Sequence, residues 1–348
     1  MKEKQWFFKT IAYLAVCLAA FALVMIVVDP YFHFHAPIKG IPYRLYEERY
    51  INDGIVRHFE YNAIITGTSM TQNFKTSEFE ELFDCSAVKL PFAGGGYREI
   101  AQNLQRAFKY NDHIEKVLWG LDGALLIKEP DYMGYEEYPT YLYDDFWWND
   151  VNYVLNKAIM YHGTFNNISM LLKGETSTTF DAYSAWEGRT GFEAVIAGHG
   201  IREMEDEDRG LSAEQRKMVE DNIEENLCPV IEQNPDTTFY LFFTPYSIVR
   251  WDLWGREGSI SAQIEAESIA AQRLLQYPNV ELYCFYENME LVSDLDHYKD
   301  PLHYTAAINS QILEWIKAGE YRLTSENNAA HAEAEKEIYL HYDYKSIH

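Results

Sequence analysis

The stretch Ala63-Ile64-Ile65-Thr66-Gly67-Thr68-Ser69-Met70 decides the predicted fold. It opens with a β-branched run, typical of a buried strand, and stops at Gly-Thr-Ser, typical of a strand-to-helix turn. About 230 positions later, Asp300-Pro301-Leu302-His303 precedes the last predicted helix. A serine nucleophile needs a base within hydrogen-bond reach, and that base needs a third group to fix its tautomer. Ser69, His303 and Asp300 are therefore the candidate catalytic residues.

Each of these residues also has a simpler interpretation. Ser69 could be the N-cap of the following helix, because serine is a preferred cap. Asp300 could cap the final helix while His303 is merely buried ahead of it. Asp296 and His297 offer a competing pair nearby, but Pro301 makes the Asp300–His303 segment the better turn.

These motifs resemble the SGNH (GDSL-like) hydrolases, in which a serine follows the first strand and an Asp-x-x-His lies near the C-terminus. The Gly67–Ser69 block is similar to the membrane-anchored branch that includes the teichoic-acid D-alanyl transfer protein and the alginate O-acetyltransferases. The resemblance covers roughly residues 60–125 and 235–320. It implies a Ser-His-Asp esterase or O-acyltransferase without a cofactor. It also implies a cell-surface glycan or teichoic-acid substrate and a membrane-bound acyltransferase as partner.

The resemblance also places an oxyanion hole and exposes one departure. Gly94 and Gly95 follow the second predicted strand, where the family carries its oxyanion glycine, although they could form a plain turn. Asp122 follows the third strand, where hydrolytic members carry the Asn of Gly-x-Asn-Asp. An ionised carboxylate would repel an oxyanion, so Asp122 must be protonated by burial, turned away or used to orient another group. This substitution favours acyl transfer over efficient hydrolysis.

Tyr246 follows the fourth predicted strand, at the sheet edge where open α/β sheets bind ligands. It could line the pocket or serve only the packing. A non-catalytic module that binds a surface polymer or a membrane partner is the alternative to an enzyme. Asp122 favours that alternative, and the candidate triad favours the enzyme.

Alternating strand and helix patterns predict an α/β fold with a doubly wound, mainly parallel sheet of the SGNH/flavodoxin-like type. The five predicted strands are 63–66, 85–90, 117–121, 237–244 and 280–285. We expect an SGNH-like domain over 61–322, interrupted at about 126–200 by an insertion rich in Tyr and Trp. The insertion is predicted to form a cap beside the carboxyl edge of the sheet. Residues 323–348 are polar and are predicted to form a weakly ordered tail.

The N-terminal residues predict a membrane anchor. Three lysines precede an uncharged run over residues 10–28, and nineteen residues at 1.5 Å each nearly span a bilayer. Lysines before the run place the N-terminus inside and the rest outside the cell. We therefore expect a cytoplasmic stub and single-pass anchor over 1–29, a linker over 30–60 and an extracytoplasmic domain. A signal peptide cleaved after Ala22 is the alternative.

Composition excludes some partners and metal sites. The net charge is −25, or about −27 when the three N-terminal lysines and Glu3 are left out, so binding to nucleic acid is excluded. The exported cysteines, Cys85, Cys228 and Cys284, are expected to be buried thiols. No Cys/His cluster has zinc-site spacing, so no metal is predicted. His33 and His35 alternate with aromatic residues and are interpreted as membrane-interface residues.

Overall fold

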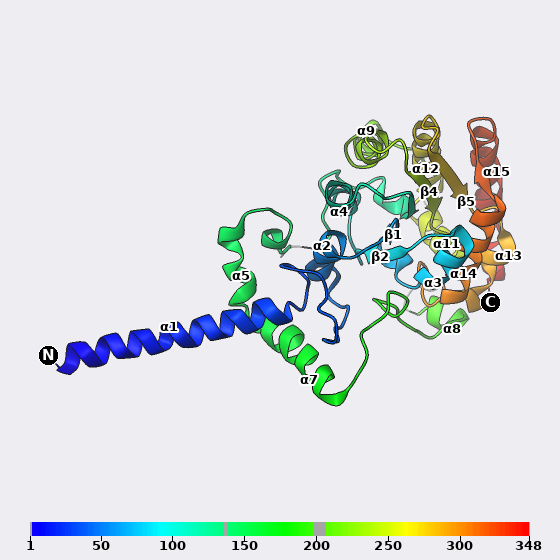
Figure 1. Ribbon diagram of the computed structural model, residues 1–348. Helices are drawn as coiled ribbons and strands as arrows, with labels where there is room; N and C mark the ends of the chain where they lie inside the picture. Colours follow the sequence, from blue (N-terminus) through cyan, green and yellow to red (C-terminus); the bar gives the residue numbers. More distant parts are fainter. Residues whose placement is uncertain (1, 136–137, 198–206, 348) are drawn as a thin grey trace. The chain divides into compact units, whose positions relative to one another are not determined.

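The computed structural model describes residues 2–135, 138–197 and 207–347, and a six-stranded sheet forms the centre of the fold (Figure 1). The strands lie in the order β2-β1-β3-β4-β5-β6, and every neighbouring pair is parallel except β5 and β6. This confirms the predicted α/β fold with a doubly wound, mainly parallel sheet. The strands are β1 Ala63–Gly67, β2 Ala87–Pro91, β3 Lys116–Leu121, β4 Thr238–Phe243, β5 Val280–Cys284 and β6 Arg322–Leu323.

The central strands are apolar because both faces of the sheet are covered. Every residue of β1 is buried, as expected for a parallel strand between two helical layers. Ala63 is aligned with Ala87 of β2 and with Lys116 of β3. The strands are therefore in register near their starts, and their carboxyl ends meet at one edge of the sheet.

Helices cover the sheet in two sets. On one side α3 packs against α14 (Figure 1). On the other, α4 contacts α10, the π-helical segment Ile223–Leu227 joins α10 to α9, and α12 packs against both α9 and α15. The helices of this unit are α3 Thr76–Phe83, α4 Tyr97–Tyr110, α8 Phe192–Val195, α9 Ala213–Asn222, α10 Cys228–Glu232, α11 Ile248–Arg256, α12 Ile260–Leu274, α13 Met289–Ser293, α14 Ala306–Ala318 and α15 Asn328–His341.

The C-terminal residues differ from the expected weakly ordered tail. They form β6 and then helix α15, which packs against α12. Tyr339 of α15 is buried, and its ring stacks on Trp251 with a centroid distance of 3.8 Å. Its hydroxyl donates to the carbonyl of Tyr286 over 2.6 Å. The prediction of a weakly ordered tail is wrong because one buried aromatic side chain anchors an otherwise polar helix.

The chain divides into two compact units, and the predicted insertion is divided between them. Residues 1–59 form one unit with 137–179, and residues 60–136 form the other with 180–348. Of the predicted insertion at 126–200, residues 136–137 and 198–200 lie outside the described part. The domain boundaries and the role of the insertion as a cap stay predictions.

In the first unit, the buried side chain of Asp29 forms several hydrogen bonds. Its carboxylate accepts hydrogen bonds from the backbone N–H groups of His33, Phe34 and His35, and from the hydroxyl of Tyr153. The helices of this unit are α1 Lys2–Val28, α2 Glu48–His58, α5 Val151–Val154, α6 Lys157–Ile159 and α7 Phe165–Lys173. Helix α1 is long and apolar enough to cross a membrane. Its length and composition suit a membrane span and a signal sequence equally.

Candidate active site

The turn after β1 places Ser69 at the carboxyl edge of the sheet. Strand β1 ends at Gly67, and a 3-10 helix, η1, begins at Ser69 and ends at Thr71. Gly67 has φ +148°, and a Cβ there would lie 3.0 Å from the carbonyl oxygen of Gly120. Thr68 is the N-cap of η1, because its side chain accepts from the N–H of Met70. The interpretation of Ser69 as the cap is therefore wrong, and its hydroxyl is left for another partner.

That partner is His303. The Ser69 Oγ lies 2.8 Å from His303 Nε2, and His303 Nδ1 lies 2.6 Å from Asp300 Oδ2. The other carboxylate oxygen of Asp300 accepts the N–H groups of Leu302 and His303, each over 2.8 Å. The structure thus brings the three candidate residues into one hydrogen-bonded series. Their catalytic roles stay predictions.

The charge of Asp300 sets the tautomer of His303. Partial burial acts to raise the pKa of the Asp300 carboxyl, but the hydrogen bonds from the His303 ring and the backbone outweigh it and hold the pKa below its ordinary value. An ionised Asp300 accepts a hydrogen bond from the N–H at Nδ1 of His303. The lone pair of Nε2 then faces the Ser69 hydroxyl. This arrangement suits His303 to take a proton from the serine hydroxyl.

The competing pair, Asp296 and His297, does not contact Ser69 in the described part of the chain. His297 Nε2 lies 3.4 Å from the carboxylate of Asp294, so its ring pairs within its own 3-10 turn. Asp296 is exposed. Of the two candidate histidines, His303 is the one that contacts Ser69.

Asp122 follows β3 and binds a group of hydroxyls. Its carboxylate accepts hydrogen bonds from Thr68, Thr244 and Tyr246. Burial raises the pKa of Asp122, while the Thr68 hydrogen bond and the nearby His303 act in the opposite direction. Of the three roles predicted for Asp122, orientation of other groups has direct contacts to support it. The Asp122 side chain connects the ends of β1, β3 and β4, and its charge interacts with His303.

Tyr246 and the glycines are placed by packing. Tyr246 is only 1% exposed and donates to Asp122. These contacts fit a role in packing better than a role in lining a pocket. Gly94 has φ +64°, a conformation that favours glycine. The Gly95 N–H donates to Phe92, and a Cβ on Gly95 would lie 2.6 Å from the carboxylate of Glu99. Packing alone therefore explains a glycine at 95, and the oxyanion role of both glycines stays a prediction.

Trp186 is a site residue that sequence reasoning missed. Its ring contacts the His303 ring edge-on, with centroids 5.3 Å apart. The backbone N–H of Trp186 donates to Asn73 Oδ1 over 2.9 Å, and its backbone carbonyl accepts from Lys299 Nζ over 2.9 Å. The same Nζ lies 3.8 Å from the centroid of the Trp186 ring, as in a cation–π contact. The sequence predicts an insertion rich in aromatic residues, but nothing in it distinguishes Trp186 from the other tryptophans.

Comparison with known proteins adds little to this geometry. No family model matches the chain, and no curated protein matches it. A solved structure described as "a putative platelet activating factor from Streptococcus pneumonia" is similar with a TM-score of 0.37 and 13% sequence identity. The match covers 78% of this chain and 90% of that chain. A similarity at this level is too low to indicate a shared activity.

Proposed function

We propose that this chain is a serine esterase or O-acyltransferase of the SGNH type. Its substrates are O-acyl groups of a cell-surface glycan or a teichoic acid, and α1 anchors it to the membrane with the α/β unit outside the cell. The observation that carries the proposal is the hydrogen-bonded series Ser69–His303–Asp300. A serine, a base and an orienting carboxylate in this order are what acyl transfer requires.

The chemistry follows from the positions of the three side chains. His303 Nε2 takes the proton of the Ser69 hydroxyl as Oγ attacks the acyl carbonyl carbon. Asp300 stabilises the imidazolium that forms. The tetrahedral intermediate collapses when His303 returns the proton to the leaving alkoxide, and Ser69 retains the acyl group. Water or a glycan hydroxyl then takes the acyl group by the reverse sequence of proton transfers.

The oxyanion needs donors that carry no negative charge. The backbone N–H of Ser69 lies at the start of η1, and the N–H of Gly94 is a second candidate. Asp122 takes no part as a donor in this proposal, because its carboxylate accepts from three hydroxyls. A smaller oxyanion hole slows hydrolysis, and it therefore fits transfer to a bound acceptor.

One observation favours a second candidate function. Asp122 stands where hydrolytic members of the resembled family carry an oxyanion donor, as expected for a module that kept the fold and lost the reaction. Such a protein would bind a surface polymer or a membrane-bound acyltransferase. An assay for turnover separates the two candidates.

The test measures acetate release and acetyl transfer with the full-length protein in detergent. The donor is an activated acetyl ester, and an unacetylated glycan is added as acceptor in a parallel reaction. We expect turnover that is lost in Ser69→Ala and His303→Ala and kept in His297→Ala, the matched histidine control. Turnover that survives Ser69→Ala, or wild-type protein that binds the glycan without turnover, contradicts the enzymatic proposal.

A further inference from the structure

A second group of reactive side chains lies where β5 meets α15. Cys284 is the last residue of β5, and His331 and Glu335 lie one turn apart on α15. One ligand atom from each of the three lies within 4.8 Å of the others. Glu335 Oε1 is 3.3 Å from Cys284 Sγ and 3.0 Å from His331 Nε2. Thiolate, imidazole and carboxylate are the side-chain groups that bind zinc in proteins.

These separations are close to those of ligands around one zinc ion. Zinc binds sulfur at about 2.3 Å and nitrogen or oxygen at about 2.0–2.2 Å, in tetrahedral geometry. Those bond lengths place neighbouring ligand atoms about 3.3–3.6 Å apart. The separations of 3.0 and 3.3 Å need only small side-chain movements to match this value.

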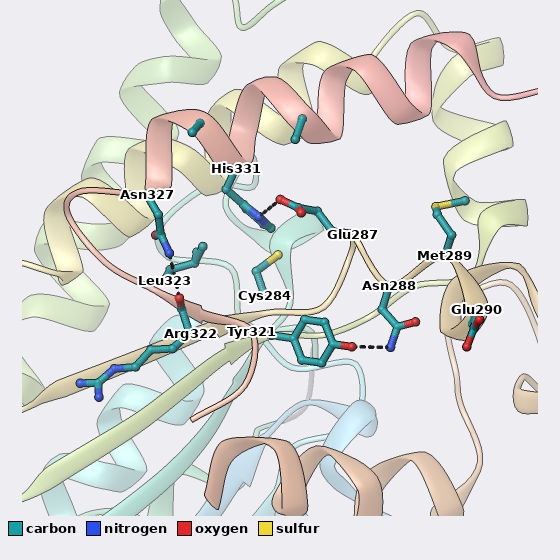
Figure 2. Close-up of a pocket in the computed structure, with 12 residues that line it drawn as sticks. Cys284, Glu287, Asn288, Met289, Glu290, Tyr321, Arg322, Leu323, Asn327 and His331 are labelled. Carbon is teal, nitrogen blue, oxygen red and sulfur yellow. Dashed lines mark hydrogen bonds and ion pairs between the residues drawn. The ribbon is translucent and has the colours of Figure 1, made fainter. Parts of the chain in front are cut away.

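Glu287 prepares His331 for this role. Figure 2 shows the hydrogen bond between His331 Nδ1 and the carboxylate of Glu287, with Cys284 beside them. The bond keeps a proton on Nδ1, so a metal ion takes the Nε2 position. That Nε2 is buried and lies 3.0 Å from Glu335 Oε1. Burial acts to lower the pKa of His331, but the Glu335 and Glu287 carboxylates outweigh it and raise the pKa, so zinc displaces a proton from Nε2. Metal-binding histidines usually donate their other N–H to a carboxylate in this way.

Two hollows meet at these side chains. The inner one has a volume of about 10 Å³, enough for one water molecule or ion, and is lined by Glu267, Cys284, His331 and Glu335 among others. The outer one is an open groove of about 810 Å³, which Cys284 and His331 also line (Figure 2). The groove gives an ion a route to the inner cavity.

Glu267 lines the inner cavity beside these three residues. It is 3% exposed, and its Oε2 is buried without a hydrogen-bond partner. Desolvation raises the pKa of Glu267, and the charge of Glu335 raises it further. Desolvation and Glu335 likewise raise the pKa of the Cys284 thiol, so this thiol is a poor nucleophile.

We propose that Cys284, His331 and Glu335 bind one zinc ion. On binding, the Cys284 thiol and His331 Nε2 each release a proton to solvent, and the thiolate sulfur and the imidazole nitrogen bond the ion. The ion joins α15 to the end of β5 and fixes the C-terminal helix on the sheet. A water molecule takes the fourth position around the ion, and the role of the ion is to hold α15 on the sheet. The site is independent of the acyl transfer proposed at Ser69.

The experiment measures zinc in the full-length protein, purified without metal-affinity steps and then incubated with excess zinc chloride and desalted. We expect about one zinc per chain by elemental analysis. Replacement by Co²⁺ is expected to give a thiolate-to-metal charge-transfer absorption that Cys284→Ala abolishes. Chelation is expected to lower the melting temperature. Wild-type protein that retains no zinc, or a cobalt spectrum without the thiolate band, overturns the proposal.

Variants test the individual ligands. Cys284→Ala and His331→Gln are expected to lose the zinc, whereas Glu333→Gln, an exposed carboxylate on the same helix, is expected to keep it. Because ligand variants can fail to fold, Glu287→Gln provides a milder test at a more exposed position. It is expected to weaken zinc binding by about 10–100-fold. An unchanged affinity in Glu287→Gln, or full zinc content in a folded His331→Gln, contradicts the proposed site.

Discussion

His303 and His331 each hydrogen-bond a carboxylate through Nδ1 and hold Nε2 toward a second group. For His303 that group is the hydroxyl of Ser69, whereas for His331 it is a buried thiol and a buried carboxylate. The same imidazole–carboxylate pair therefore occurs in two different surroundings. The surroundings decide whether such a pair moves protons or binds a cation.

Exposure and charge separate the two sites. The His303 side chain is 21% exposed and has the neutral Ser69 hydroxyl across the imidazole, whereas the His331 side chain is 13% exposed. The Glu335 side chain is 3% exposed and lines a small cavity with Glu267. An open site with one charge suits acyl transfer, and a closed site with several acidic groups suits a metal ion.

The largest expected effect separates the two histidines by activity. Ser69→Ala and His303→Ala are each expected to lower kcat by about 10⁴–10⁶-fold, and the double variant is expected to be little worse, because the two act as one unit. His331→Gln is expected to leave kcat near the wild-type value below its melting temperature. Steady-state kinetics of the four proteins measure this. An additive double variant, or an inactive but folded His331→Gln, would break the comparison.

The two orienting carboxylates provide the next test. Asp300→Asn is expected to lower kcat by about 10²–10⁴-fold, because an amide favours the wrong tautomer of His303 and does not stabilise its cation. Glu287→Gln is expected to leave kcat unchanged. Kinetics of both variants under saturating zinc measure the contrast. Equal effects on kcat would mean that neither carboxylate has a specific role at Ser69.

Asp122→Asn sharpens the account of the oxyanion hole. An amide replaces the carboxyl group near His303 and can donate a hydrogen bond, so ester hydrolysis is expected to rise. One added donor sets a ceiling of about 10²–10³-fold. Tyr246→Phe is the control, because it removes one hydroxyl from Asp122 and keeps the carboxylate. A decrease in hydrolysis would show that Asp122 matters more for holding the Thr68 turn.

The smallest effect concerns acid stability. The pKa of Asp300 is lowered from 3.8 on folding, so its contribution to stability is present above pH 4 and is lost as pH falls through the folded-state pKa. Asp300→Asn lacks this contribution. Because the side chain is well exposed, we expect at most about 1 kcal/mol. Urea unfolding at pH 7 and pH 2.5 measures it, and a gap between the proteins that widens in acid would contradict the assignment.

The sequence predicted the sheet because its central strands carry strong local signals. The run at 63–66 matches β1, and the other four predicted strands match β2–β5 within two residues at each end. The two-residue β6 has no such signal, because its pairing with β5 depends on the chain returning from α14. Helix α15 was missed because its sequence is polar and only a few residues, Tyr339 among them, are buried.

The candidate active site could be predicted because its motifs are local in sequence. The proposed zinc site could not, because its residues are far apart in sequence. Ser69 follows a strand and His303 lies three residues after Asp300, so both motifs are local. Cys284 and His331 are 47 positions apart, and only the packing of α15 on the sheet brings them together. The expectation of no metal rested on sequence spacing alone. The contact between Trp186 and His303 likewise depends on tertiary packing.

The central claim is that Ser69 is a nucleophile activated by His303, and covalent labelling tests it most directly. The full-length protein is treated with a fluorophosphonate, digested and examined by mass spectrometry. The account predicts one label on the peptide that contains Ser69, absent in Ser69→Ala, strongly reduced in His303→Ala and retained in His331→Gln. Folded wild-type protein that stays unlabelled at Ser69, or labels equally in His303→Ala, would contradict it.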